Sequence, residues 1–211
     1  MDTRNKKYLS AIDRLRELPE IFHGSAAIAR FRWTSKTGSQ YFYKWAAAGL
    51  ILPFGGHSDV FANLVANPKP NTGAMCRLAM PGAVIVGIDA LRRAGWTTQI
   101  QRSPEVAVPA WQPVYKTPFY TPSPRPASWF AAVKYGISEE QEVLPTLQPE
   151  LALVDLLKRD GWAGCSLDPD DIDWPDEPFT GKRWEKACQT FGVEPNTFNP
   201  DAHDMSFDMS M

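Results

Sequence analysis

The fold is decided by the stretch SAAIARFRWTSKTGSQYFYKWAAAGLILPFGGHSDVFANL, which occupies residues 25–64. Its first part, SAAIARF, is rich in alanine and predicts a short helix. After the polar break RWTSK, the segment Thr37–Ala48 predicts a second helix, because the apolar residues Tyr41, Trp45 and Ala48 recur at spacings of four and three and form one face. Gly49 stands where a glycine commonly ends a helix. Two apolar runs on either side of Gly55 and Gly56 then predict a β-hairpin.

Helix, tight turn, helix and hairpin, in this order, are typical of a winged helix-turn-helix, in which the second helix enters the major groove of DNA. The polar break supplies Thr34 and Ser35, either of which can cap the second helix. Upstream, residues 5–18 carry an apolar stripe that predicts an amphipathic helix ending at Pro19. The alternative is a small helical subdomain whose polar face only meets solvent.

The second helix carries polar residues at the end that would point toward base edges. Glutamine can bond adenine through two hydrogen bonds, serine and threonine suit base edges or phosphates, and arginine and lysine neutralise phosphates. His57, at the tip of the hairpin, could reach a phosphate or the minor groove, or could simply face solvent. The sequence therefore predicts a DNA-binding set made of Arg30, Arg32, Ser35, Lys36, Thr37, Ser39, Gln40, Tyr43, Lys44 and His57.

Charge is unevenly distributed along the chain, although the formal net charge is only −2. Residues 1–70 hold ten Lys and Arg against five Asp and Glu, and residues 71–135 hold seven against two. Residues 136–211 hold five against seventeen. A basic front that coincides with the helix-turn-helix favours a nucleic-acid partner, whereas an acidic end can also serve solubility alone.

A proline- and asparagine-rich segment, ANPKPNTG at residues 66–73, predicts a domain boundary near residue 68. We therefore expect an α+β protein with an N-terminal winged helix-turn-helix, residues 1–68, followed by a mixed α/β domain, residues 69–195. Residues 196–211 contain few aliphatic side chains and predict a flexible tail.

The pattern of apolar residues and helix breakers predicts several elements in the second domain. Helices are expected from Pro81 to Gly95, over residues 147–160, and over residues 182–191. Strands are expected at residues 96–100, 105–108 and 114–116. Clustered prolines in residues 118–126 predict an extended segment or a loop, and residues 125–135 fit no single state.

The sequence contains no residue set that indicates catalysis or a cofactor. Cys76, Cys165 and Cys188 lie far apart, without a CxxC or Cys/His pair, so no zinc site is expected. No nucleophile-elbow, dinucleotide or phosphate-loop motif occurs. The acidic segment Asp168–Glu177 fits a solvated loop, or an intramolecular mimic of DNA charge, better than a metal site, because the ligand spacing of a calcium loop is absent. We therefore expect no enzyme, no cofactor and no metal.

Cysteine usage and hydropathy bear on location. An odd number of cysteines without a signal-peptide pattern predicts a reducing cytoplasm. The longest apolar run, Ala83–Ile88, is too short to span a bilayer, so no membrane partner is expected. The sequence therefore predicts a soluble, cytoplasmic protein.

Four pieces of the sequence, in their order along the chain, resemble the AbiEi family: AGLI before the hairpin, PGAVIVGIDALRRAGWTTQI, LQPELALVDLLKRDGW and DPDDIDW. Members of that family are antitoxins and transcriptional repressors of type IV toxin–antitoxin systems. The resemblance extends over residues 20–175 and lies in the order of the pieces rather than in a single motif. The first helix and the segment after residue 176 fall outside it.

The resemblance implies a function for each domain. The N-terminal domain would bind inverted repeats in double-stranded promoter DNA, with residues 35–44 reading the sequence and copies associating on the repeats. The second domain would support antitoxin activity against a nucleotidyltransferase-like toxin, with no need for a stable complex. The acidic C-terminus and the proline-rich middle differ from the family pattern. These differences bear on the antitoxin role implied for the second domain more than on the DNA binding implied for the first. The competing interpretation is a protein-interaction module that docks a toxin or another partner through its acidic C-terminal region, without sequence-specific DNA binding.

Overall fold

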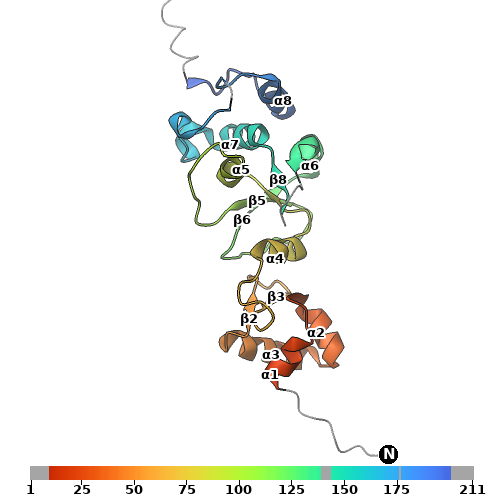
Figure 1. Cartoon of the computed structure of the whole chain (residues 1–211). Helices are drawn as coiled ribbons and strands as arrows, with labels where there is room; N and C mark the ends of the chain where they lie inside the picture. Colours follow the sequence, from red (N-terminus) through yellow and green to blue (C-terminus); the bar gives the residue numbers. More distant parts are fainter. Residues whose placement is uncertain (1–9, 139–143, 176, 201–211) are drawn as a thin grey trace, which may run out of the picture. The chain divides into compact units, whose positions relative to one another are not determined.

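The structure is a computed structural model that describes residues 10–138, 144–175 and 177–200 (Figure 1). Its contacts divide the chain into two compact units. The first unit comprises residues 1–81 and 115–119, and the second comprises residues 82–114 and 120–211. Helices occur together with two separate sheets, so the fold class is α+β.

The elements of the first unit follow the order helix, strand, helix, helix, strand, strand, helix. They are α1 (Ala11–Arg16), β1 (Ile21–His23), α2 (Gly24–Phe31), α3 (Ser35–Ala47), β2 (Ile51–Pro53), β3 (Val60–Asn63) and α4 (Thr72–Ala79). The strands form an antiparallel sheet in the order β1-β3-β2, with Phe22 opposite Phe61. The helices and the hairpin predicted within residues 25–64 are confirmed.

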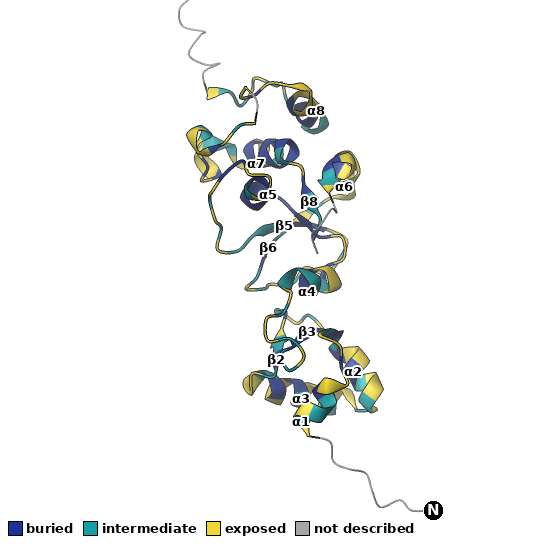
Figure 2. Cartoon of the chain, in the orientation of Figure 1, coloured by how far each residue is buried: buried dark blue, intermediate teal, exposed yellow. Residues whose placement is uncertain are grey.

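The core of the first unit is formed by buried residues of α1, α2, α3 and the sheet, which are dark blue on the ribbon of Figure 2. On α3, Gly38, Phe42 and Trp45 are buried at spacings of four and three residues, which gives the helix one inward face. Gly38 lets α2 approach closely, because a Cβ there would lie 2.4 Å from Cγ1 of Ile28. The buried apolar residues of this core are Leu15, Leu18, Phe22, Ala27, Phe42, Trp45 and Ile51.

Asn63, the last residue of β3, is fully buried and ties the sheet to α1. Its side-chain amide donates to the carbonyl oxygens of Leu15 and Leu18, at 2.7 and 3.2 Å. Its Oδ1 accepts from the backbone amides of Val65 and Ala66. A buried amide with all of these partners fixes the end of α1 relative to the hairpin.

The second unit is built on a five-stranded sheet with helices beside it. Its elements are β4 (Val84–Ile85), α5 (Gly87–Arg93), β5 (Glu105–Pro109), β6 (Thr121–Arg125), α6 (Ala127–Val133), β7 (Ile137–Ser138), β8 (Thr146–Leu147), α7 (Pro149–Gly164) and α8 (Lys182–Phe191). The strand order is β6-β5-β4-β8-β7, and the pairs β5–β6 and β4–β8 are parallel. Helix α7 packs against both α5 and α8, and its apolar side is buried.

Several elements of the second unit agree with the sequence prediction. Helix α7 begins at Pro149, and α8 covers residues 182–191 as expected. Gly161 interrupts α7 with a φ of 63°, next to the expected end of that helix. Strand β5 confirms the strand expected at residues 105–108, and the proline-rich segment is extended as β6.

One helix predicted in the second domain starts later than expected, and two predicted strands are wrong. The helix expected from Pro81 begins only at Gly87, because the apolar run before it pairs with β5 and β8 as strand β4. Residues 96–100 are not a strand, since Trp96 turns into the interior and packs on Trp174 with ring centroids 5.4 Å apart. Residues 114–116 are irregular as well.

The unit boundary and the C-terminal segment also differ from expectation. The segment expected to be a linker runs into α4, and the division between units falls after Pro81 rather than near residue 68. Part of the expected tail is held in place, because the indole N–H of Trp162 donates to the carbonyl oxygen of Phe198. The remainder of that tail, residues 201–211, lies outside the described residues.

Candidate nucleic-acid interface

The outward side of α3 is set by the cap at its start and by its buried face. Thr34 accepts a hydrogen bond from the backbone amide of Thr37 at 3.2 Å, so the helix begins at Ser35. With Phe42 and Trp45 directed inward, the exposed residues fall in two adjacent rows at four-residue spacing. The two rows, which we call the α3 polar face, are Ser35, Ser39 and Tyr43, and Lys36, Gln40 and Lys44.

The α3 polar face is open and contains no acidic side chain. Tyr43 is 78% exposed. In the part of the chain that the structure describes, no hydrogen bond or ion pair engages the side chains of Lys36, Gln40 or Lys44. The hydroxyl of Ser39, by contrast, donates to the carbonyl oxygen of Ser35 at 3.0 Å. Two lysine ammonium groups and one amide can therefore meet a ligand without first breaking an internal contact.

Thr37 differs from the other residues of the predicted set. It is half-buried, and its Oγ1 lies 2.9 Å from Oγ1 of Thr34. Its backbone amide donates to the same Thr34 oxygen. We therefore assign Thr37 to the capping of α3 and not to the α3 polar face.

Arg30 and Arg32 lie at the end of α2, where the chain turns toward α3. Arg30 is exposed, and its guanidinium lies 3.4 Å from a carboxylate oxygen of Glu17. An exposed pair of this kind contributes little, so Arg30 can exchange its partner for a phosphate at small cost. Arg32 is the C-cap of α2 with a φ of 53°, and its exposed side chain has no ion-pair partner among the described residues. Both arginines add positive charge beside the turn.

The hairpin between β2 and β3 turns at Gly55, Gly56 and His57, which all have positive φ. The segment 115–119, which belongs to the first unit although it lies far along the chain, packs on this turn. A Cβ on Gly55 would lie 2.5 Å from the carbonyl oxygen of Lys116, so glycine is required for this close approach. The side chain of His57 stays exposed at the tip.

Lys116 is a candidate residue for contact with nucleic acid that could not be identified from the sequence. Its side chain is exposed, while its backbone lies against the hairpin tip. Phe119, in the same segment, packs on the buried ring of Phe54 with centroids 6.2 Å apart. In the sequence, only the pair Gly55 and Gly56 indicated this contact, because glycines allow another segment of backbone to approach closely as well as forming a tight turn.

In the acidic segment after α7, two of the carboxylates form hydrogen bonds within the protein. Asp168 and Asp171 form a capping box around a short 3₁₀ turn. Asp171 also accepts a hydrogen bond from the side-chain amide of Gln99 at 2.8 Å. Within the described ranges, no three His, Cys, Asp or Glu side chains come together in a way that could hold a metal ion.

No protein-family model matches the chain, and no curated protein matches it. Among the described helices, none combines the length and the apolar composition needed to cross a bilayer. The proposal for function therefore depends on the α3 polar face itself.

Proposed function

We propose that the chain is a sequence-specific DNA-binding protein that reads an operator through the α3 polar face. The order of elements from α1 to β3 and the sheet order β1-β3-β2 support a winged helix-turn-helix, with α3 as recognition helix and the β2–β3 hairpin as wing. The observation that carries the proposal is the pair of exposed rows on α3, where two lysines and a glutamine have no internal partner among the described residues.

Each residue has a role that follows from its chemistry. Gln40 is the candidate for direct base reading, because its amide can bond adenine through two hydrogen bonds. Lys36 and Lys44 neutralise phosphates, and Arg30 and Arg32 add charge beside the turn. Neutralised phosphates release bound counterions, so affinity falls steeply as salt rises.

We further propose that the chain represses its own operon and acts as the antitoxin of a type IV toxin–antitoxin pair, as the AbiEi resemblance implies. Two copies on an inverted repeat would place their recognition helices one helical turn apart, about 34–36 Å, or a multiple of that distance. The toxin would be a nucleotidyltransferase-like protein, and its neutralisation would need no stable complex.

Fluorescence anisotropy with the duplex directly upstream of the gene, and with a shuffled duplex of equal composition, tests the DNA-binding proposal. We expect tighter binding to the upstream duplex and a steep negative salt dependence for both. Gln40→Ala should relax discrimination at one base pair by about 1–3 kcal/mol and leave binding to the shuffled duplex unchanged. An absence of binding at low salt would favour the competing interpretation, a module that docks a protein partner through its acidic C-terminal region.

The antitoxin role has a separate test in the neighbouring reading frame. That frame should encode a nucleotidyltransferase-like protein whose expression stops growth, and co-expression of this chain should restore growth. Gln40→Ala should keep the rescue, because Gln40 belongs to the first unit and the resemblance assigns antitoxin activity to the second domain. If operator binding holds and rescue fails, the chain is a repressor without antitoxin activity.

A further inference from the structure

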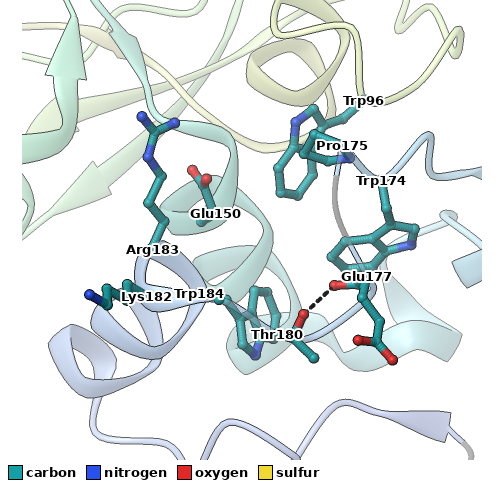
Figure 3. Close-up of a pocket in the computed structure, with 10 residues that line it drawn as sticks. Trp96, Glu150, Trp174, Pro175, Glu177, Thr180, Lys182, Arg183 and Trp184 are labelled. Carbon is teal, nitrogen blue, oxygen red and sulfur yellow. Dashed lines mark hydrogen bonds between the residues drawn. The ribbon is translucent and has the colours of Figure 1, made fainter.

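A pocket in the second unit combines tryptophan rings with a buried carboxylate (Figure 3). Its volume is about 250 Å³, and its lining comes from the chain after α5, the first turn of α7, the segment before α8 and the first turn of α8. The tryptophans are Trp96, Trp174 and Trp184. The proposed DNA-binding function makes no use of this pocket.

The three indole rings are held in a fixed arrangement around Trp174. The ring centroid of Trp96 lies 5.4 Å from that of Trp174, and Trp184 meets Trp174 edge to face at 6.0 Å. The indole N–H of Trp184 donates to the carbonyl oxygen of Pro195 at 3.0 Å. A wall of packed aromatic rings needs little reorganisation when a ligand arrives, and aromatic faces attract cations through their negative potential.

Glu150 supplies the second feature of the pocket. The residue is only 8% exposed and lines the pocket from the first turn of α7. Among the described residues, no hydrogen bond or ion pair engages its carboxylate. The carboxylate oxygens of Glu150 are not among the fully buried polar atoms without a partner, so they reach the open space of the pocket, where the helix dipole favours an anion. A bound cation would supply the missing partner.

Two cationic side chains, Lys182 and Arg183, also line the pocket. Both are exposed, so water and salt screen their charge, whereas the charge of the buried Glu150 is screened far less. The exposed carboxylate of Glu177 lines the same opening and offsets part of their charge. The electrostatic preference of the interior is therefore set by Glu150.

We propose that this pocket binds a small organic cation, with an alkylated ammonium group placed between the tryptophan rings and the Glu150 carboxylate. Tryptophan is the aromatic side chain that attracts ammonium groups most strongly, and quaternary ammonium ligands are recognised by groups of such rings. The pocket is smaller than the roughly 300–1,000 Å³ typical of sites for drug-sized ligands, so it selects a ligand of few heavy atoms. The proposal does not depend on DNA binding.

Calorimetric titration of the full chain with choline and with 3,3-dimethylbutan-1-ol tests the proposal. The two probes have nearly the same shape, but only choline carries a charge. We expect choline to bind and the neutral alcohol to bind at least about tenfold more weakly, because the alcohol lacks the attraction to the rings and to the carboxylate. Equal binding of both probes, or no binding of choline at millimolar concentration, would overturn the proposal.

Glu150→Gln tests the carboxylate directly. The change removes a charge that has no internal partner, so the variant should fold, and we expect it to bind choline about tenfold more weakly. The matched control, Glu185→Gln, removes an exposed carboxylate of α8 that does not line this pocket, and it should leave choline affinity unchanged. A folded Glu150→Gln variant with wild-type affinity for choline would refute the role of Glu150.

Discussion

The exposed lysines of α3 in the first unit differ from a group of paired arginines in the second unit. In the first unit, Lys36 and Lys44 stand on the exposed side of α3 without a partner among the described residues. In the second unit, Arg125 donates to Asp155 at 2.9 Å. Arg159 contacts both carboxylate oxygens of Glu105, at 2.6 and 3.1 Å, and it also bonds Asp160.

This difference shows what a count of charges along the sequence leaves out. The hydrogen bonds from Arg159 to Asp160 and Glu105 raise the pKa of its guanidinium above the ordinary value, despite partial burial. In the same unit, Arg92 lies 3.0 Å from the buried carboxylate of Asp89. The pairs made by Arg125 and Arg159 join α7 to the sheet, whereas the Arg92 pair lies within α5. In each case the guanidinium already has a carboxylate partner and is not free to meet a phosphate. The positive excess of residues 71–135 therefore overstates the basic surface that this part of the chain offers.

The largest expected effect is the loss of stability on removing one of the paired arginines of the second unit. Arg125→Met should lower the free energy of unfolding by about 3–5 kcal/mol, because it leaves the mostly buried carboxylate of Asp155 without its ion-pair partner. Urea unfolding followed by circular dichroism measures this loss. The control Arg102→Met, at an exposed position, should change stability by less than about 0.5 kcal/mol. A loss below about 1 kcal/mol for Arg125→Met would show that the network contributes little.

A smaller effect is expected where a polar side chain holds the first unit together. Asn63→Ala should cost about 1–3 kcal/mol of unfolding free energy, because two carbonyl oxygens and two amides lose a buried partner. The same urea titration measures it, with Asn196→Ala at an exposed position as the control. Equal stability of the two variants would mean that Asn63 does not tie the sheet to α1.

Lys44→Ala tests whether an exposed, unpaired lysine of α3 contacts DNA phosphates. We expect weaker binding to every duplex, and a log–log salt slope that is shallower by about 1, because one phosphate contact is lost. Stability should not change, since no internal contact is removed. Lys134→Ala, an exposed lysine of the second unit, serves as the matched control. A Lys44→Ala protein whose salt slope equals that of the control would place α3 away from the phosphates.

The smallest effect concerns Lys116, beside the hairpin tip. Lys116→Ala should weaken binding a few-fold without altering sequence preference, because a lysine beside the wing meets phosphates rather than base edges. Anisotropy with the upstream and shuffled duplexes should show the same factor for both. A larger loss on the upstream duplex would instead assign base reading to the wing.

Much of the first unit could be predicted because its signals are local. Thr34 or Ser35 as a cap, the spacing of Tyr41 and Trp45, and Gly49 after the helix each act within a few residues. The buried face nevertheless combines Trp45 with Phe42, while Tyr41 is half-buried and Ala48 is exposed. The position of segment 115–119 could not be predicted, because no local pattern announces a contact between parts of the chain far apart in sequence. The strand β4 before Gly87 could not be predicted, because a short apolar run fits a helix and a buried strand equally well.

The candidate sites, too, could be predicted where their signals are local in sequence and not where they depend on distant segments. The α3 polar face was predictable in outline, because a buried helical face defines the opposite exposed one. The capping role of Thr37 could not be predicted. A threonine three residues after the cap can either face solvent or form a hydrogen bond with the hydroxyl of the cap residue, as Thr37 does with Thr34. The pocket around Glu150 could not be found from the sequence either, because Trp96, Trp174 and Trp184 come from separate segments without a shared pattern.

Site-specific crosslinking tests the central claim, that α3 meets DNA, most directly. The three native cysteines are buried, and burial raises the pKa of the Cys76 thiol to about 12 and that of Cys188 to about 11, so they react poorly near neutral pH. Ser39→Cys on α3 and Ser128→Cys on α6 each add one exposed thiol for a photoactivatable label. We predict that the label at position 39 crosslinks duplex DNA and that the label at position 128 does not. Crosslinking from position 128 alone, or equally from both, in proteins that still bind DNA would contradict the account.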